Sequence, residues 1–423
     1  MKHLLEKVLH CFLLSSLALF LHPLTANAQT GIWSATGSMI TARADQTATL
    51  LPTATLLPNG QVLVAGGCVG NCDDVALASA ELYNPSTGIW SATGSMNATR
   101  FDGDTATLLP NGQVLVAGGV STGYGVPVPN AELYDPATGT FSATGAMVTV
   151  RNQYSASLLS NGQVLLVGGC LDNGDGCVLV PGAELYNAAT GTFGATGSLI
   201  TARVGNTLTL LPNGQVLVAG GNNANNSLFF ASAELYNPAT GTFSATGSMT
   251  TARTGQSATL LPNGQVLVAG GYNASNSYLA SAELYNPATG TFSATGSMTT
   301  ARIGQTATPL SIGEVLVAGG GNNSGSLRSA ELYNPATGIF SATGSMISAR
   351  STDTATPLPN GEVLVAGGNG GSGPLASAEL YLYISVPTNK DACKSNGWMT
   401  LTRPDGSSFK NQGDCIQFVN TGK

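Results

Sequence analysis

The chain repeats one pattern of hydrophobic and polar positions about every 50 residues. Each copy holds an apolar run ending in a double glycine, then an Ala-Glu-Leu-Tyr segment, then an aromatic-x-Ala-Thr-Gly segment. The double glycine occurs seven times, at Gly66-Gly67, Gly118-Gly119, Gly168-Gly169, Gly220-Gly221, Gly270-Gly271, Gly319-Gly320 and Gly367-Gly368. A fixed period of this length indicates a repeat architecture.

One copy predicts four short antiparallel strands, at 257–261, 265–269, 281–286 and 291–295. The first two strands are joined by a Pro-Asn-Gly turn, which is typical of a hairpin. The second is apolar on both faces, as a strand buried between two sheets should be. Four strands in each of seven copies predict an all-β fold, a seven-bladed β-propeller.

The order of the pieces predicts how the ring closes. The repeats begin at 31–37 with a strand of the fourth type, and they end at 355–381 with the first three types. Joining these segments completes the last blade with the N-terminal strand. Pro309 and Pro357 fall in first strands, and proline is tolerated only at a sheet edge, so we expect strand one at the central channel.

Residues 31–383 resemble the kelch repeat. The shared pattern is an arginine, an apolar strand, Gly-Gly, and then Glu-Leu-Tyr-Asn-Pro and an aromatic residue. The departure is that most copies have Phe where kelch repeats usually have Trp. The resemblance implies a propeller of the secreted bacterial type, in a family that includes carbohydrate oxidases and a sialic acid mutarotase.

The first 28 residues are typical of a secretory signal peptide. Lys2 and Lys7 precede the apolar run 8–21, and Ala26-Asn27-Ala28 offers a cleavage site after Ala28. The apolar run is short for a membrane span, which is the competing interpretation. We therefore expect a secreted, periplasmic or cell-surface protein without a membrane span after cleavage. The only histidines are in this segment, at His3, His10 and His22. Their removal excludes Ser-His-Asp and Cys-His catalysis and His-ligated metals.

Six cysteines remain, and an exported chain favours disulfides. Of the 15 possible pairings, sequence neighbours suggest Cys68–Cys72, Cys170–Cys177 and Cys393–Cys415. Cys68 and Cys72 could instead be free thiols or a metal site. Asp172-Asn173-Gly174-Asp175-Gly176 resembles part of a calcium loop, but the closing glutamate is missing. We expect no metal and no cofactor.

Charge is scarce and follows the repeat. Only 9% of residues are charged and the net charge is −7, which argues against nucleic acid as a partner. Residues 31–383 contain no lysine, yet each copy keeps one arginine and one glutamate. This repetition predicts a structural ring of buried ion pairs that locks blade to blade, while the alternative is an anion site at the channel mouth. The ring residues are Arg43, Arg100, Arg151, Arg203, Arg253, Arg302, Arg350, Glu81, Glu132, Glu184, Glu234, Glu283, Glu331 and Glu379.

Asymmetry is concentrated in the loops between the second and third strands. Variable loops on a rigid scaffold are a common place for recognition. Their candidate ligand-binding residues are Tyr124, Phe229, Phe230, Tyr272 and Tyr278, although these aromatics could instead pack on the blade rim. We expect a monomeric, non-enzymatic binding or scaffold protein for a glycan, peptide or protein. The alternative is a sugar-active enzyme of the mutarotase or lyase type, using a ring arginine and an acid such as Asp102, Asp104 or Asp353.

Residues 384–423 differ in composition from the repeats. They resemble a short two-cysteine module found at the ends of exported bacterial proteins. A unit this small needs its Cys393–Cys415 bridge to hold a fold. We expect either an attachment module or a tail packed on the ring.

Overall fold

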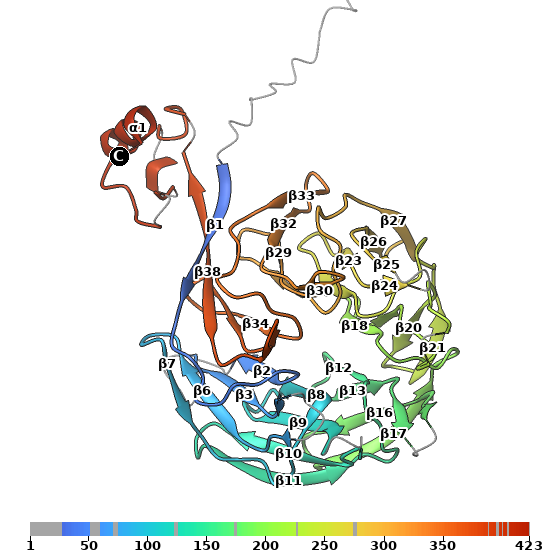
Figure 1. Ribbon diagram of the computed structural model, residues 1–423. Coiled ribbons are helices and arrows are strands. Elements are labelled where there is room, and N and C mark those ends of the chain that lie inside the picture. Colours follow the sequence, from blue (N-terminus) through green and yellow to red (C-terminus); the bar gives the residue numbers. More distant parts are fainter. Residues whose placement is uncertain are drawn as a thin grey trace, which may run out of the picture. The chain divides into compact units, whose positions relative to one another are not determined.

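The computed structural model describes residues 28–50, 60–70, 75–121, 126–172, 176–225, 227–273, 277–387, 389–394, 397–399, 401–403 and 406–422 (Figure 1). The chain divides into two compact units. The larger covers Thr30–Tyr383, and the smaller has its C-terminal part at Ile384–Lys423.

The larger unit is a ring of seven four-stranded antiparallel sheets, which confirms the predicted seven-bladed propeller (Figure 1). Blades 1 to 3 contain β2 (Thr47–Leu50), β3 (Val62–Ala65), β6 (Ala80–Asn84) and β7 (Ile89–Ala92); β8 (Phe101–Leu108), β9 (Val114–Val120), β10 (Asn130–Asp135) and β11 (Thr140–Ala146); and β12 (Ser155–Leu158), β13 (Val164–Val167), β16 (Gly182–Asn187) and β17 (Thr192–Ser198). Blades 4 and 5 contain β18 (Thr207–Leu210), β19 (Val216–Ala219), β20 (Ala233–Asn237) and β21 (Thr242–Ala245); and β22 (Ser257–Leu260), β23 (Val266–Ala269), β26 (Ala282–Asn286) and β27 (Thr291–Ala294).

Blade 6 contains β28 (Thr306–Pro309), β29 (Val315–Ala318), β32 (Ala330–Asn334) and β33 (Ile339–Ala342). Blade 7 contains β34 (Thr354–Pro357), β35 (Val363–Ala366), β38 (Ala378–Val386) and β1 (Ala28–Ala35), in the order β1-β38-β35-β34. The N-terminal strand therefore completes the last blade, as predicted. Each first strand lies at a sheet edge and contacts the first strands of both neighbouring blades, so the first strands surround the channel.

Short hairpins extend the loops between second and third strands in five blades. They are β4 (Cys68–Val69) with β5 (Val75–Ala76), β14 (Cys170–Asp172) with β15 (Cys177–Leu179), β24 (Tyr272–Asn273) with β25 (Ser277–Tyr278), β30 (Gly321–Asn322) with β31 (Gly325–Ser326), and β36 (Asn369–Gly370) with β37 (Gly373–Pro374). These hairpins lie on the same face of the ring as the segments that connect one blade to the next, because isolated β-bridges such as Thr254 with Tyr272 join the two.

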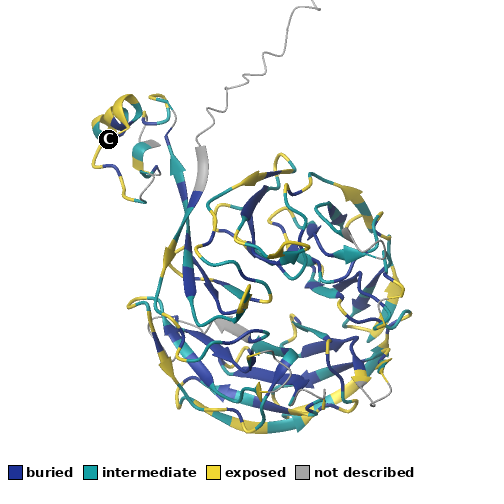
Figure 2. Cartoon of the chain, in the orientation of Figure 1, coloured by how far each residue is buried: buried dark blue, intermediate teal, exposed yellow. Residues whose placement is uncertain are grey.

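The core lies between adjacent blades and is supplied mainly by the second strands (Figure 2). Val62 and Val64 of β3 pack against blade 7, whereas Leu63 and Ala65 of the same strand pack against blade 2. Alternate side chains of a strand point to opposite faces, so a strand that is apolar on both faces serves two interfaces. This explains why each second strand reads as an unbroken apolar run.

The smaller unit is built on one helix and one disulfide. It contains the short 3-10 helix η1 (Gly397–Met399) and α1 (Gln412–Thr421), and Asn411 caps α1 by accepting a hydrogen bond from the Asp414 backbone. Leu401, Phe409 and Phe418 pack around the Cys393–Cys415 bridge. Among the described residues, no helix is both long and apolar enough to cross a membrane.

Candidate functional site

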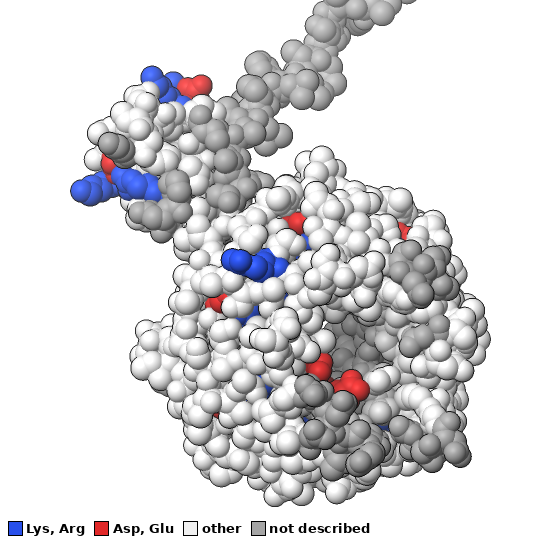
Figure 3. Space-filling view, in the orientation of Figure 1, with Lys and Arg blue, Asp and Glu red and all other residues white. Residues whose placement is uncertain are grey.

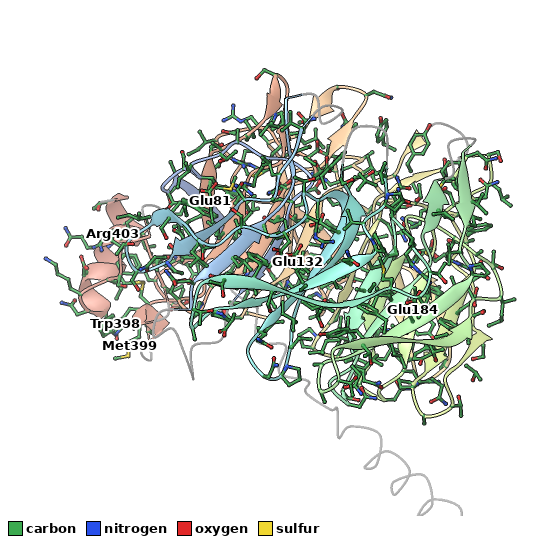
Figure 4. The ribbon with its side chains drawn as sticks, turned by 90° about the horizontal axis from the view of Figure 1, so that it is seen from below. Glu81, Glu132, Glu184, Trp398, Met399 and Arg403 are labelled. Atoms are coloured by element: carbon green, nitrogen blue, oxygen red, sulfur yellow. A yellow bond between two sulfur atoms is a disulfide. The ribbon has the colours of Figure 1, made fainter. Side chains whose placement is uncertain are left out.

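Each repeat arginine forms an ion pair with the glutamate of the same blade. The Nη2–Oε1 distances range from 2.7 Å in Arg43–Glu81 to 3.1 Å in Arg253–Glu283. All seven arginines are 0% exposed. Figure 4 labels Glu81, Glu132 and Glu184 within successive blades. The guanidinium groups of the ring are therefore closed off from an external anion.

Each buried ion pair makes further hydrogen bonds. In blade 5, Arg253 also donates to the Gly270 and Ser281 carbonyl oxygens at 2.8 and 2.9 Å. The Glu283 carboxylate accepts backbone N–H bonds from Thr250 and Thr251. Burial lowers the pKa of Arg253, while the charge of Glu283 opposes that shift. Both charges of the pair are therefore compensated where water is excluded.

The arginine backbone links one blade to the next. Arg253 lies in the segment that connects blade 4 to blade 5, and its carbonyl accepts from Gly221 N at 2.8 Å. Its side chain meanwhile holds Glu283 of blade 5. The same backbone bond joins Gly271 to Arg302 and Gly368 to Arg43, across the ring closure. The ion pair thus joins the connecting segment to the following blade, and the main chain of the same arginine bonds to the preceding blade.

Three of the predicted aromatic residues lie together. Phe229 belongs to the loop of blade 4, and its ring centroid lies 5.7 Å from that of Tyr272 in blade 5. Tyr272 and Tyr278 face each other across the β24–β25 hairpin with centroids 5.4 Å apart. Phe229 is only 8% exposed, whereas both tyrosines are half-buried. We call Phe229, Tyr272 and Tyr278 the aromatic cluster; Phe229 supports it and the tyrosines form its surface.

A fourth aromatic candidate, Phe230, does not belong to that cluster. The Arg203 guanidinium carbon lies 5.2 Å from the Phe230 ring centroid, so Phe230 covers a ring arginine. Tyr124 lies outside the described residues. Sequence composition suggested all five aromatics equally, because it does not show which rings of neighbouring blades meet.

Four residues, two of them aspartates, share one repeat position in consecutive blades, and the sequence interpretation did not identify them as a unit; we call this group the acidic arc. Thr352, Asp45, Asp102 and Gln153 adopt φ between 47° and 52° on four consecutive blades, numbers 7, 1, 2 and 3. The equivalent residues of blades 4 to 6 are Gly205, Gly255 and Gly304, for which this left-handed conformation costs little. Acidic side chains lie beside the central hollow in Figure 3. In the sequence, this group could have been found from the residue two places after the ring arginine, which is not glycine in these four blades.

The acidic arc contains an aspartate whose pKa is raised. Burial, and after it the nearby Asp102, raises the pKa of Asp45 to about 6, against the opposing effect of a hydrogen bond with Thr352. Gln153 Nε2 donates to Asp102 Oδ2 at 3.4 Å. Within the part of the chain that the structure describes, no group of three or more His, Cys, Asp or Glu residues could hold a metal ion.

Two candidate acids, Asp104 and Asp353, lie deeper, each 8% exposed. Burial raises the pKa of each carboxyl to about 7, against the opposing charge of the arginine in the same blade. Neither side chain forms an ion pair among the described residues. They are lone buried carboxyls beside ring arginines.

Five of the six cysteines predicted to form disulfides lie within the described residues. Cys170–Cys177 and Cys393–Cys415 are formed. Cys68 is disulfide-bonded, and its predicted partner Cys72 lies outside the described residues.

A cleft of about 290 Å³ lies between the tight turns of blades 4 and 5. Its Asn263 and Gln265 side chains bond to each other at 2.9 Å, which leaves these amides less able to bind a ligand.

Comparison with known proteins supports the propeller assignment. Residues 52–97 and 253–299 match the Kelch motif, so the chain is a β-propeller that carries Kelch motifs. The fold is similar to that of a fungal alcohol oxidase of the AA5 family, solved in complex with copper. That match has a TM-score of 0.67 and 16% sequence identity, and it covers 87% of this chain and 78% of the other. No curated protein sequence is significantly similar to this chain. At this identity the oxidase shows the shared fold alone.

Proposed function

We propose that this protein is an exported, non-enzymatic binding protein that recognises an uncharged ligand, foremost a glycan, through the loop face of the propeller. The aromatic cluster carries the proposal. Two half-buried tyrosines are supported by a buried phenylalanine from the neighbouring blade, with ring centroids 5.4 and 5.7 Å apart. Rigid aromatic surfaces on loops of a stable scaffold are typical of recognition sites.

The scarcity of exposed cations on the propeller argues against an anionic ligand. Residues 31–383 contain no lysine, and the seven ring arginines are fully buried. The exposed Arg328 uses its Nε to bond the Met346 carbonyl at 2.9 Å. Tyrosine combines a flat apolar ring with a hydroxyl that can donate or accept, which suits the apolar faces and hydroxyls of a sugar.

Export is supported by two observations. Disulfides persist in oxidising compartments, and the described chain contains Cys170–Cys177 and Cys393–Cys415. The first 28 residues have the composition of a signal peptide. The smaller unit, with its own core and bridge, is proposed to be an accessory module of the exported protein.

A glycan array tests the proposed function. The purified protein is compared with Tyr272→Ala and Tyr278→Ala, and with Ile339→Ala as a control, since Ile339 is 60% exposed on an outer strand. We expect selective glycan binding that both tyrosine variants lose and the control keeps. Equal binding by all four proteins, each shown to be folded by circular dichroism, would reject the aromatic cluster as the site.

A second candidate, a sugar mutarotase or lyase, rests on Asp104 and Asp353. Their lack of an ion-pair partner and their pKa of about 7 are properties of a general acid or base. Their burial at 8% exposure favours a structural role instead. Anomer exchange of sugars followed by NMR separates the two functions. Catalysis that disappears in Asp104→Asn or Asp353→Asn, with Tyr278→Ala unaffected, would favour the enzyme.

A further inference from the structure

Asp104 and Asp353 occupy a position that other blades fill with a neutral hydrogen-bond donor. In blades 1, 5 and 6 the residue is glutamine, and its Nε2 donates to an alanine carbonyl of the preceding blade at 2.9 Å. These bonds are Gln46 to Ala366, Gln256 to Ala219 and Gln305 to Ala269. In blade 3 the Tyr154 hydroxyl donates to Ala117 in the same way. In these four blades the position therefore supplies a donor to a carbonyl of the preceding blade. In blade 4 it is Asn206, whose Nδ2 donates instead to Ser155 Oγ at 3.5 Å.

A carboxyl oxygen of each aspartate lies near the first glycine of the double glycine in the preceding blade. A methyl group added to the first glycine of the preceding blade would lie 3.3 Å from Asp104 Oδ2 and 3.1 Å from Asp353 Oδ1, at Gly66 and Gly319 respectively. The same construction at Gly270 meets Gln305 Nε2. An ionised carboxylate has no hydrogen to donate, whereas a protonated carboxyl has one. Only the protonated form can replace the glutamine.

A second difference occurs in the same two blades. In five blades the arginine Nε donates to the carbonyl of the threonine two residues earlier, as Arg253 does to Thr251. In blades 2 and 7 that threonine is replaced by Ala98 and Ser348. Among the described atoms, Nε of Arg100 and Arg350 and both carboxyl oxygens of Asp104 and Asp353 are buried without a hydrogen-bond partner. A protonated carboxyl supplies the missing donor at the interface, because its O–H can donate where the glutamine Nε2 donates in blades 1, 5 and 6.

We propose that Asp104 and Asp353 are protonated in the folded ring at acidic pH and act as donors across the interfaces between blades 1 and 2 and between blades 6 and 7. These two interfaces then weaken as the pH rises. They lie on either side of blades 7 and 1, the pair that contains the ring closure. The propeller would thus carry a pH-sensitive element at the blades where its chain ends join.

The surroundings of both carboxyls set the direction of the pH effect. Asp104 interacts electrostatically with Arg100, Asp45, Asp102 and Tyr154, and Asp353 with Arg350 and Glu379. Arg100 and Arg350 are already paired with Glu132 and Glu379. The arginines therefore only partly offset the desolvation that disfavours the ionised carboxylates.

The sign of the change in stability with pH follows from the pKa of each aspartate in the unfolded and in the folded state. An aspartate in the unfolded chain has a pKa of about 4, and burial raises the pKa of both side chains to about 7 in the fold. Between these values the folded state holds protons that the unfolded state has lost. The stabilisation is complete below about pH 4 and is lost as the pH rises to about 7. Each aspartate should raise the unfolding constant about tenfold per pH unit in that window.

Two measurements test the proposal. Urea unfolding is followed from pH 4 to 8 for the wild type, the double variant Asp104→Gln/Asp353→Gln, and the control Glu362→Gln, in which an acid elsewhere in blade 7 is neutralised. We expect the double variant to lose less stability than the wild type as the pH rises, and the control to lose as much as the wild type. Identical pH profiles for wild type and double variant would overturn the proposal.

Infrared spectroscopy provides a readout that does not depend on stability. At pH 5.5 the wild type should show a protonated-carboxyl band that exceeds that of Asp104→Asn/Asp353→Asn. Asp45 also contributes to this band, because its pKa is raised to about 6. The Asp45→Asn variant identifies that share. A spectrum unchanged by the double substitution would show that both aspartates are ionised at pH 5.5 and would overturn the proposal.

Discussion

Nη2 of Arg253 lies 3.1 Å from Oε1 of Glu283, with the arginine 0% and the glutamate 2% exposed, and the same contact recurs in every blade. Seven buried ion pairs in a chain that is only 9% charged show where its charge is used. The arginine side chain holds its own blade, and its carbonyl holds the preceding one. We therefore propose that uncharged loop residues, and not the ring arginines, make the ligand contacts.

Arg253→Ala should destabilise the protein by about 3–5 kcal/mol, because Glu283 would remain buried without its partner. The urea midpoint at pH 7 measures this change. Arg328→Ala is the matched control, since Arg328 is exposed and forms no ion pair with a described residue. A destabilisation below about 1 kcal/mol, the range of surface pairs, would show that the ring pair is not a structural element.

Gln153→Gly should stabilise the ring slightly, by up to about 1 kcal/mol. Gln153 is exposed and has a φ of 52°, a conformation that costs a residue with a Cβ about 1–2 kcal/mol. Glycine removes that cost but adds freedom to the unfolded chain, so the net gain is small. Thermal unfolding compares it with Gln153→Ala, which keeps the strain. If the glycine variant is less stable than the alanine variant, strain at this position is not the dominant effect.

Removing the Cys393–Cys415 bridge should unfold the smaller unit while the propeller stays folded. The bridge closes a separation of 22 residues, for which chain entropy gives about 3 kcal/mol. The masses of the tryptic fragments distinguish the units, because the exposed Lys394 and Lys410 lie in the smaller unit, whereas the propeller has the exposed Arg328 and seven buried ring arginines. Cys393→Ser/Cys415→Ser should be cut rapidly in the smaller unit, and Cys170→Ser/Cys177→Ser should not. Equal cutting rates in both variants would contradict this.

The fold could be predicted from the sequence because the repeat presents the same evidence seven times. Alternation, Asn-Gly turns and double glycines fix four strands per copy, and the positions of 31–37 and 355–381 fix how the ring closes. Pro309 and Pro357 correctly indicated the edge strand.

The candidate site was less predictable, because it depends on contacts between blades. Phe229 and Phe230 are sequence neighbours, yet one supports Tyr272 and the other covers Arg203. Likewise, Asp104 and Gln305 look unrelated in sequence, although both lie at the same blade-interface position. Which neighbouring side chain each residue meets follows from the closed ring and not from local pattern.

The central claim is that buried charge maintains the ring while the half-buried tyrosines of the aromatic cluster recognise the ligand. The most direct test measures urea stability and glycan binding together for Arg253→Ala and Tyr278→Ala. We predict that Arg253→Ala loses stability and that its folded fraction still binds, whereas Tyr278→Ala keeps its stability and loses binding. A stable Arg253→Ala variant that no longer binds would contradict the account and would assign the arginine ring to the ligand.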